Sequence, residues 1–224
     1  MTETYRLTMP ANWRRLDLAE GAKASIDSLV DDATAKLPRD SAAAAKHRLR
    51  ARLTATVDEL QGTDGARMQS MFFPVPKSGA DILPMTLTCG GVDAPLSVDK
   101  EDTTAVLLSF VKTNPTAKPV DADGVVALRT HSFRDITAEL TEETEAMIGD
   151  LATAESPPLP PEQRAFQMRA SYLFAAPGTA DWHLIVGSAT LPTNDADNEV
   201  TEAVLGLFDA IVSTLKWSAE VENV

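Results

Sequence analysis

The sequence predicts an α+β protein in which a mainly antiparallel β-sheet is flanked by helices. Three observations support this fold class. The expected elements follow in the order strand, two helices, two strands, helix, strand, loop, two strands and helix, so hairpins outnumber parallel crossovers. Hydrophobic residues make up 44% and charged residues 24% of the chain, which is ordinary for a globular protein. The 224 residues suffice for one well-filled core, so we expect a single domain over residues 1–224.

The N-terminal part alternates apolar and polar residues and then changes to a helical period. Residues 4–9 predict the first strand, and Trp13 follows in a turn. Apolar residues then recur at helical spacing in two runs that are separated by Pro38. The two runs predict a helical insertion at residues 18–61, after the first strand.

The middle of the chain returns to a period of two. Residues 66–73 and 81–89 predict the two strands of a hairpin, and Pro84 indicates that the second strand lies at an edge or carries a bulge. A helix is expected over about residues 100–112. After a tight Asp-Gly turn, residues 125–134 predict a further strand.

The last third contains the most regular patterns. Residues 135–162 predict a short helix followed by an acidic, proline-rich surface loop. Residues 166–174 and 181–191 predict a hairpin whose second strand is apolar on both faces, as expected at the centre of a sheet. Residues 198–216 carry the best apolar stripe in the chain and predict a closing helix on the core.

Two segments of the chain contain motifs typical of a known family. The motifs are Pro10-Ala11-Asn12-Trp13 after the opening strand, Tyr172-Leu173-Phe174-Ala175-Ala176-Pro177-Gly178 and Trp182-His183-Leu184-Ile185-Val186 in the late hairpin, and the closing helix from Leu207 to Trp217. In these motifs the chain resembles the PsbP-like superfamily. The chain is most similar to the uncharacterised actinobacterial branch of that superfamily. The similarity covers residues 4–16 and 163–217. The resemblance implies an αβα sandwich that acts as a binding, adaptor or chaperone module without catalysis.

The chain departs from that family in two respects. It shows no lipoprotein signal, and the paired helices at 18–61 enlarge the N-terminal region. The resemblance therefore transfers no functional residue. Its concrete implication is a secretion-associated chaperone or an immunity-type partner.

The charge of the chain limits the classes of partner. The net charge is −13, and residues 71–224 contain 9 Lys and Arg against 23 Asp and Glu, whereas residues 1–70 contain 11 against 10. An acidic surface repels phosphate backbones, so we expect no nucleic-acid partner. No apolar run approaches the ~20 residues that span a bilayer, so we expect no membrane insertion. With one cysteine and no secretion signal, the expected location is the cytoplasm.

No catalytic motif accompanies the three histidines. His47 lies among basic residues, and His131 and His183 fall within predicted strands without a Gly-x-Ser-x-Gly motif. Cys89 lies on an apolar strand face, where a buried and inert thiol is expected. The run Asp195-Ala196-Asp197-Asn198-Glu199 lacks the later glycine and glutamate of a calcium loop and is better explained by helix capping. We therefore expect no enzymatic activity, no catalytic or metal-binding residue and no cofactor.

Two hypotheses about function remain. The first is a non-catalytic module that binds a protein or peptide through the basic residues of the second predicted helix, Lys46, Arg48, Arg50 and Arg52. These residues could equally pair with the protein's own acids. The acidic, proline-rich loop is the alternative docking element, and its run at 157–161 could present a polyproline II ligand, although a plain exposed linker is the favoured interpretation. The second hypothesis is a small-molecule binder or hydrolase with a pocket between the sheet and the insertion helices, lined by Trp182, His131 or Arg129. A homodimer is a third option.

Overall fold

The computed structural model describes residues 4–35, 39–61, 66–75, 83–93, 103–114, 116–142, 164–179 and 181–218. The strands are β1 (Thr4–Arg6), β2 (Trp13–Asp17), β3 (Ala66–Pro74), β4 (Met85–Val92), β5 (Lys118–Ala122), β6 (Val125–Asp135), β7 (Phe166–Ala175), β8 (Trp182–Leu191) and β9 (Lys216–Ser218). The helices are α1 (Ala22–Thr34), α2 (Arg39–Gln61), α3 (Thr103–Thr113) and α5 (Glu199–Ser213). Residues 137–142 are also helical.

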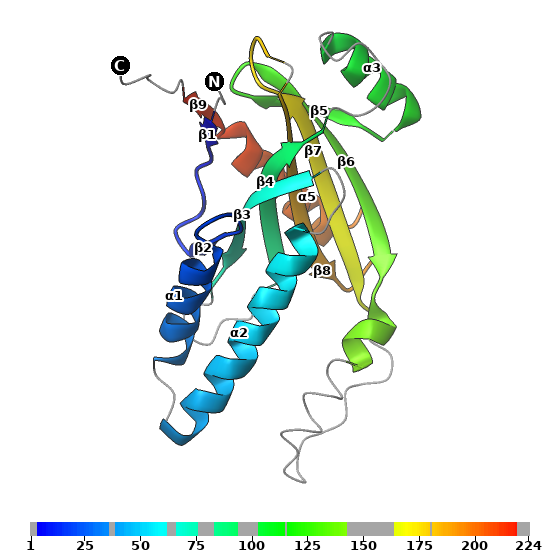
Figure 1. The fold of residues 1–224 in the computed structure, drawn as a ribbon. Coiled ribbons are helices and arrows are strands. Elements are labelled where there is room, and N and C mark those ends of the chain that lie inside the picture. Colours follow the sequence, from blue (N-terminus) through cyan, green and yellow to red (C-terminus); the bar gives the residue numbers. More distant parts are fainter. Residues whose placement is uncertain are drawn as a thin grey trace, which may run out of the picture.

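A seven-stranded antiparallel sheet forms the centre of the molecule, with helices on both of its faces (Figure 1). The strand order is β2-β3-β4-β8-β7-β6-β5, and every neighbouring pair is antiparallel. The two ends of the described chain meet in a separate ribbon, in which β1 pairs with β9. The predicted α+β fold class is confirmed.

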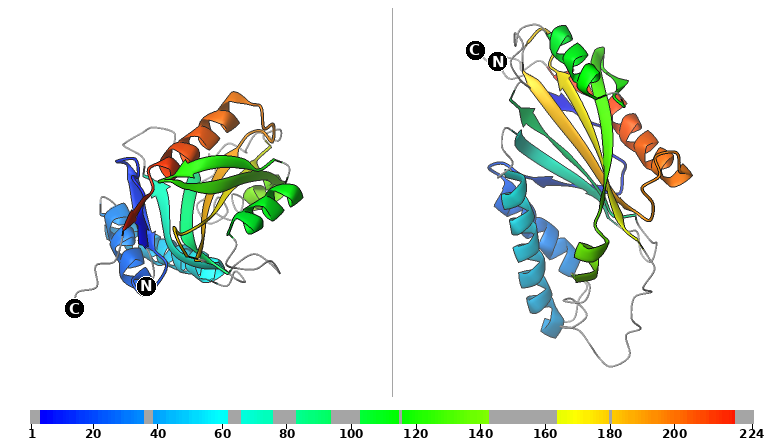
Figure 2. Two further views of the ribbon diagram at one scale, coloured as in Figure 1. Left: turned by 90° about the horizontal axis from the view of Figure 1, so that it is seen from above. Right: turned by 90° about the vertical axis from the view of Figure 1, so that its right-hand side faces the viewer.

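α5 covers one face of the sheet and closes the main core (Figure 2). Side chains alternate between the two faces along each strand, so every second residue of β4, β7 and β8 points toward this helix. Tyr172, Phe174 and Phe208 are the largest fully buried side chains of this layer. Gly187 allows the close approach of α5, because a Cβ atom here would lie 2.6 Å from the Phe208 ring. We call this side of the sheet the α5 face.

The opposite face carries helices in two separate places. α1 and α2 pack over β2 and β3, where Leu16, Val30 and Met71 are buried, and their apolar cluster reaches Val186 of β8. α3 packs over the far end of β7 and β8, where Val106 and Trp182 belong to a small apolar cluster. Between these places no helix of the described chain covers the sheet (Figure 1).

Several sequence predictions are confirmed and one needs correction. β8 lies at the centre of the sheet, and Cys89 is buried. Asn198 is the N-cap of the closing helix, and its side chain accepts a hydrogen bond from the Val200 N–H at 3.0 Å. Pro84 does not mark an edge strand, because β4 lies between β3 and β8; the proline precedes the strand, and its carbonyl accepts from the Thr190 N–H. The predicted turn at Trp13 is confirmed, since the Trp13 N–H donates to the Pro10 carbonyl at 2.9 Å, and Trp13 also opens β2. The strands β2, β5 and β9 were not predicted.

Candidate functional site

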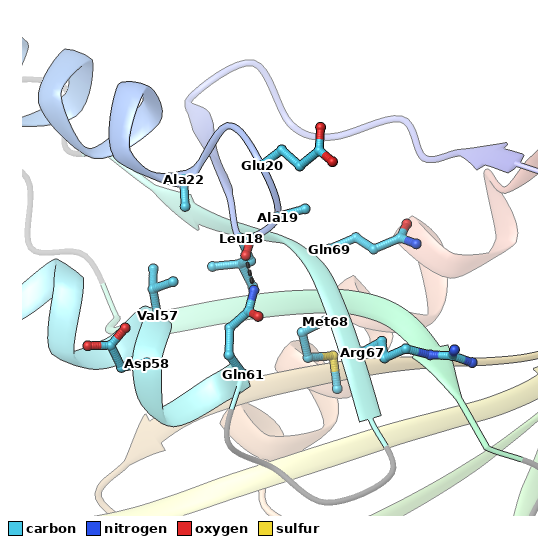
Figure 3. A pocket seen from close by; sticks show the side chains of 10 residues that line it. All are labelled: Leu18, Ala19, Glu20, Ala22, Val57, Asp58, Gln61, Arg67, Met68 and Gln69. Carbon is cyan, nitrogen blue, oxygen red and sulfur yellow. Dashed lines mark hydrogen bonds between the residues drawn. The ribbon is translucent and has the colours of Figure 1, made fainter.

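A hollow of about 560 Å³ lies between β3 and the pair α1 and α2 (Figure 3). It is lined by Leu18, Ala19, Glu20, Ala22, Val57, Asp58, Gln61, Arg67, Met68 and Gln69. β3 bulges here, because its pairing with β4 shifts between Met68 and Ser70. The side-chain amide of Gln61 donates a hydrogen bond to the Leu18 carbonyl and thereby joins α2 to the loop after β2 (Figure 3).

The lining of this hollow combines apolar and charged side chains. Glu20, Asp58 and Arg67 are its charged members, and the described lining includes no histidine, cysteine, serine or threonine. It therefore offers apolar surface, charge and hydrogen bonds to a ligand, without a nucleophile held beside a base. It lies where a pocket was expected, between the sheet and the insertion helices.

The three residues that were predicted to line this pocket lie elsewhere and do not converge. Trp182 is buried beneath α3 on the face opposite α5. Arg129 and His131 point to the α5 face, because the register of β6 against β7 places them opposite Tyr172 and Ala170. The sheet itself therefore separates Trp182 from the other two.

The two histidines of the sheet share the α5 face but not a site. His131 lies opposite Ala170 on β7, and His183 lies opposite Phe174, four residues further along the same strand. Two strand spacings and four residues of strand separate them by roughly 16 Å. A single catalytic group cannot contact both side chains at hydrogen-bonding distance.

His183 belongs to a buried cluster of aromatic rings at the ribbon of β1 and β9. The rings of Tyr5, Phe174, His183 and Trp217 all lie with centroids 5.2–6.0 Å apart. Burial lowers the pKa of His183, and its Nε2 has no hydrogen-bond partner among the described residues. Burial also raises the pKa of the neighbouring Cys89 thiol to about 12, so the reactive thiolate is disfavoured at neutral pH. The cluster therefore joins the termini through apolar packing.

Arg129 is committed to a buried contact between the sheet and α5. Its guanidinium forms an ion pair with Asp209 of α5, and the Tyr172 hydroxyl donates to the other carboxylate oxygen at 2.8 Å. Burial, followed by the hydrogen bond to Asp209, raises the pKa of Tyr172. The ion pair compensates the charges of Arg129 and Asp209, and together with the Tyr172 hydrogen bond it holds α5 against β6 and β7.

The predicted basic docking residues lie along α2, and two of them pair with α1. Lys46 forms an ion pair with Asp31 at 2.7 Å, and Arg50 forms one with Asp27 at 2.8 Å. The hydrogen bond and charge of Lys46 lower the pKa of Asp31. The other two, Arg48 and Arg52, are exposed. Part of this charge therefore holds the two helices together.

The uncovered part of the sheet, which we call the polar face, was not predicted as a site. Its side chains come from neighbouring strands in register: Thr86, Ser188, Arg169 and Ser132 in one row, and Ser171 and Thr130 in the next. The signal was present in the sequence, since every second residue from Thr130 to Arg134 and from Gln167 to Ser171 is polar. It indicates a solvated strand face.

The polar face is bordered by a sheet edge that no described strand covers. β5 pairs with β6 only from Val125 to Arg129, so residues 130–135 form the border of the sheet (Figure 1). We call these residues the open edge of β6. The turn between the two strands has positive φ at Asp123 and Gly124, as in a two-residue hairpin. In such a hairpin the flanking pair, Ala122 and Val125, is hydrogen-bonded.

The alternation of the ladder then determines which main-chain groups the open edge presents. Starting from Val125, odd-numbered residues of β6 point their N–H and C=O toward β5, and even-numbered ones point toward β7. Beyond Arg129, the groups of His131 and Phe133 therefore point away from the sheet. Their side chains are half-buried on the α5 face and form an edge-to-face pair at 5.9 Å.

The described residues contain no cluster of three or more His, Cys, Asp and Glu side chains that could hold a metal ion. In the loop before α5, Asp195 accepts a hydrogen bond from the Asp197 N–H, which is turn geometry. None of the helices in the described chain combines the length and apolarity needed to cross a membrane.

Fold and surface together define an α+β protein with a sealed core on one face of its sheet and a polar face with an open edge on the other. Comparison of the chain with protein-family models, with curated proteins and with solved structures gave no match.

Proposed function

We propose that the protein is a non-catalytic module that binds another protein or a peptide. The polar face and the open edge of β6 carry this proposal. Sheets normally protect their edges with proline, charge or a covering segment. β5 has such protection in Lys118 and Pro119, whereas the open edge of β6 presents unprotected main-chain groups at His131 and Phe133.

The positions of the reactive side chains support a non-catalytic role. His131 and His183 are too far apart to act on one atom, and Cys89 is buried. Arg129 is already bound to Asp209. Each of these groups has a structural role in the core beneath α5, and none faces the polar face.

A selection from a peptide library displayed on phage tests the proposal. The chain is immobilised and the selection is carried out at low and at moderate salt, with the bare support as control. We expect an enriched peptide sequence whose synthetic form slows amide hydrogen exchange in part of the described chain. Failure to enrich any sequence under either condition would contradict the proposal.

The hollow of Figure 3 favours a second candidate function, the binding of a small molecule. Its volume of about 560 Å³ is within the range of ligand pockets. A screen by thermal unfolding should find a compound that raises Tm for the wild type and not for Ala19→Trp, which fills the hollow. Ala24→Trp, on the exposed side of α1, is the control and should keep the response. An equal response of both variants would exclude this site.

The resemblance to the PsbP-like superfamily supports the same class of function, and we propose membership of that family. The concrete role that we propose is a cytoplasmic chaperone or immunity-type partner. Co-expression with the products of neighbouring genes tests this role, and a complex of fixed stoichiometry is expected with one of them. If each product elutes separately on sizing chromatography, the proposed role is wrong.

A further inference from the structure

We propose that the open edge of β6 accepts an extended acidic peptide as an additional strand of the sheet. This inference rests on the proposed function, and it names the binding site and the chemical class of the partner. A strand that adds to a sheet edge gains affinity from main-chain hydrogen bonds and specificity from side-chain contacts on both sides.

The main-chain geometry of the open edge suits such an addition. His131 and Phe133 present two N–H donors and two C=O acceptors in the spacing of an antiparallel or parallel ladder. On its other side, β6 pairs with β7 in a continuous register from Leu128 to Asp135, and this pairing holds His131 and Phe133 in place. The template is therefore rigid before the peptide arrives, which reduces the ordering cost of binding.

A second hollow continues the line of the open edge beyond the end of β6. Its volume is about 450 Å³, and it is lined by Asp135, Thr137, Ala138, Glu139 and Arg164. A peptide strand that follows β6 to its end would place a side chain at this hollow. Such a pocket at one end of an added strand fixes the register of the peptide, because main-chain hydrogen bonds alone allow more than one register.

Among the described residues near the open edge, the charge without a counter-ion is positive. Glu139 pairs with Arg134 at 2.7 Å. Hydrogen bonds from Thr137, and then the charge of Arg164, lower the pKa of Asp135, so this acid stays ionised and Arg164 offsets its charge. Lys118 and Arg169 form no ion pair with any residue of the described chain. They flank the open edge, since Lys118 pairs with Arg129 and Arg169 with Ser132.

The pKa of His131 also responds to the positive charges near the open edge. Burial lowers this pKa first, and the positive charges of Arg129 and Lys118 lower it further. The chain as a whole carries −13. At physiological salt, however, charges more than about 8 Å away are largely screened, so the nearby cations determine which peptide is favoured.

The same charges disfavour a second copy of the chain on this edge. Two β6 edges paired about a two-fold axis would place the unpaired Arg169 of each copy on the same stretch of the polar face, without bringing an unpaired acid of the described chain to it. Like charges across a strand pair are destabilising. Glutamate or aspartate side chains on an added strand would instead lie near Arg169 where they point to the polar face, or near Lys118 where they point to the α5 face, and we therefore assign the edge to an acidic peptide.

The test uses the full chain and two synthetic peptides, one alternating valine with glutamate and one alternating valine with lysine. Fluorescence anisotropy measures the affinity of each. Phe133→Pro removes an outward N–H at a position where an edge strand tolerates proline. Phe133→Ala is the matched control, because it loses the same ring and keeps the N–H.

We expect the acidic peptide to bind the wild type and Phe133→Ala, and to bind Phe133→Pro about tenfold more weakly than Phe133→Ala. The lysine peptide should bind none of them measurably better than a scrambled sequence. Urea unfolding of both variants confirms that each is folded at the assay temperature. Equal affinity of folded Phe133→Pro and Phe133→Ala would overturn the proposal that a strand is added here.

A second pair of variants tests the charge. Arg169→Gln should lower the affinity for the acidic peptide about threefold, and the difference from the wild type should disappear at high salt. Arg14→Gln is the control, because Arg14 is exposed on β2, the strand at the opposite edge of the sheet. If Arg169→Gln binds as the wild type does at low salt, the acidic class of the peptide is wrong.

The remaining outcomes separate this inference from the proposed function. A phage-selected peptide that binds Phe133→Pro and Phe133→Ala equally, and protects α2 from exchange, would overturn the site while the binding function stands. Self-association that Phe133→Pro abolishes would identify a second copy as the occupant and overturn the acidic peptide. Absence of any selected peptide would remove the proposed function itself.

Discussion

The two faces of the seven-stranded sheet are built differently, although the same strands supply both. On the α5 face, Met168, Tyr172 and Phe174 of β7 are fully buried. Their neighbours Arg169 and Ser171 point the other way and remain accessible. One face therefore contributes most of the stability, and the other has surface that packing does not require. A binding site can change on the polar face at little cost in folding free energy.

The largest expected effect is on the α5 face. Phe208→Ala removes a ring that is fully buried against Gly187, and should lower the free energy of unfolding by about 3–5 kcal/mol. Val200→Ala, on the exposed side of the same helix, should change it by less than about 0.5 kcal/mol. Urea unfolding measures both. Similar values for the two variants would show that α5 does not seal the core in this way.

The close approach of α5 to β8 can be tested with two glycines. Gly187→Ala places a methyl group 2.6 Å from the Phe208 ring and should cost about 1–3 kcal/mol. Gly206→Ala, within α5, meets no atom within 4 Å and should stabilise the protein by about 0.5–1 kcal/mol. Thermal unfolding gives both values. A stabilising Gly187→Ala would mean that the helix lies further from the sheet.

The histidines of the α5 face predict a pH dependence. Burial lowers the pKa of His183, so the unfolded chain binds this proton more readily than the folded chain does. The corresponding stability is fully present above the unfolded pKa of about 6.5 and is lost as pH falls below it toward the folded pKa.

His183→Phe keeps an aromatic ring in the cluster and removes the titration. Between about pH 7.5 and about pH 5.5 the wild type should lose stability and the variant should lose less. Asp31 and Asp135, whose pKa values are lowered, lose their contribution only below about pH 4, outside this range. An unchanged pH profile in His183→Phe would show that this side chain does not contribute.

The smallest effects are expected for the ion pairs between α1 and α2. The side chains of Lys46 and Arg50 are 40% and 46% exposed, so Lys46→Ala and Arg50→Ala should each cost less than about 0.5 kcal/mol. These variants also compare the basic helix with the polar face as docking elements. A selected peptide that lost affinity for Lys46→Ala and kept it for Arg169→Gln would favour the helix.

The long periodic segments were predictable from the sequence, and the short strands were not. The hairpins of β3 with β4 and β7 with β8, and the helix α5, have patterns long enough to specify a face. β9 has three residues, and it forms because Tyr5 lies opposite Trp217 at the other end of the chain. A strand that depends on so distant a partner leaves little local signal.

The candidate site illustrates the same limit. The basic residues of α2 were visible in the sequence, but their pairing with Asp27 and Asp31 depends on how α1 folds back on α2. Trp182 and His131 both occupy predicted strands, yet the register of β6, β7 and β8 places them on opposite faces.

The sequence by itself determined the class of fold and the residues that share a strand face, because side chains alternate with a period of two. It also determined that α5 packs on the core, since its apolar stripe must be buried. Only the tertiary structure decided that the face bearing Arg169 and Ser171 stays uncovered and that β6 has an open edge. That outcome depends on where α1, α2 and α3 pack and on β5 beginning only at Lys118, and such non-local packing has no periodic signal along the chain.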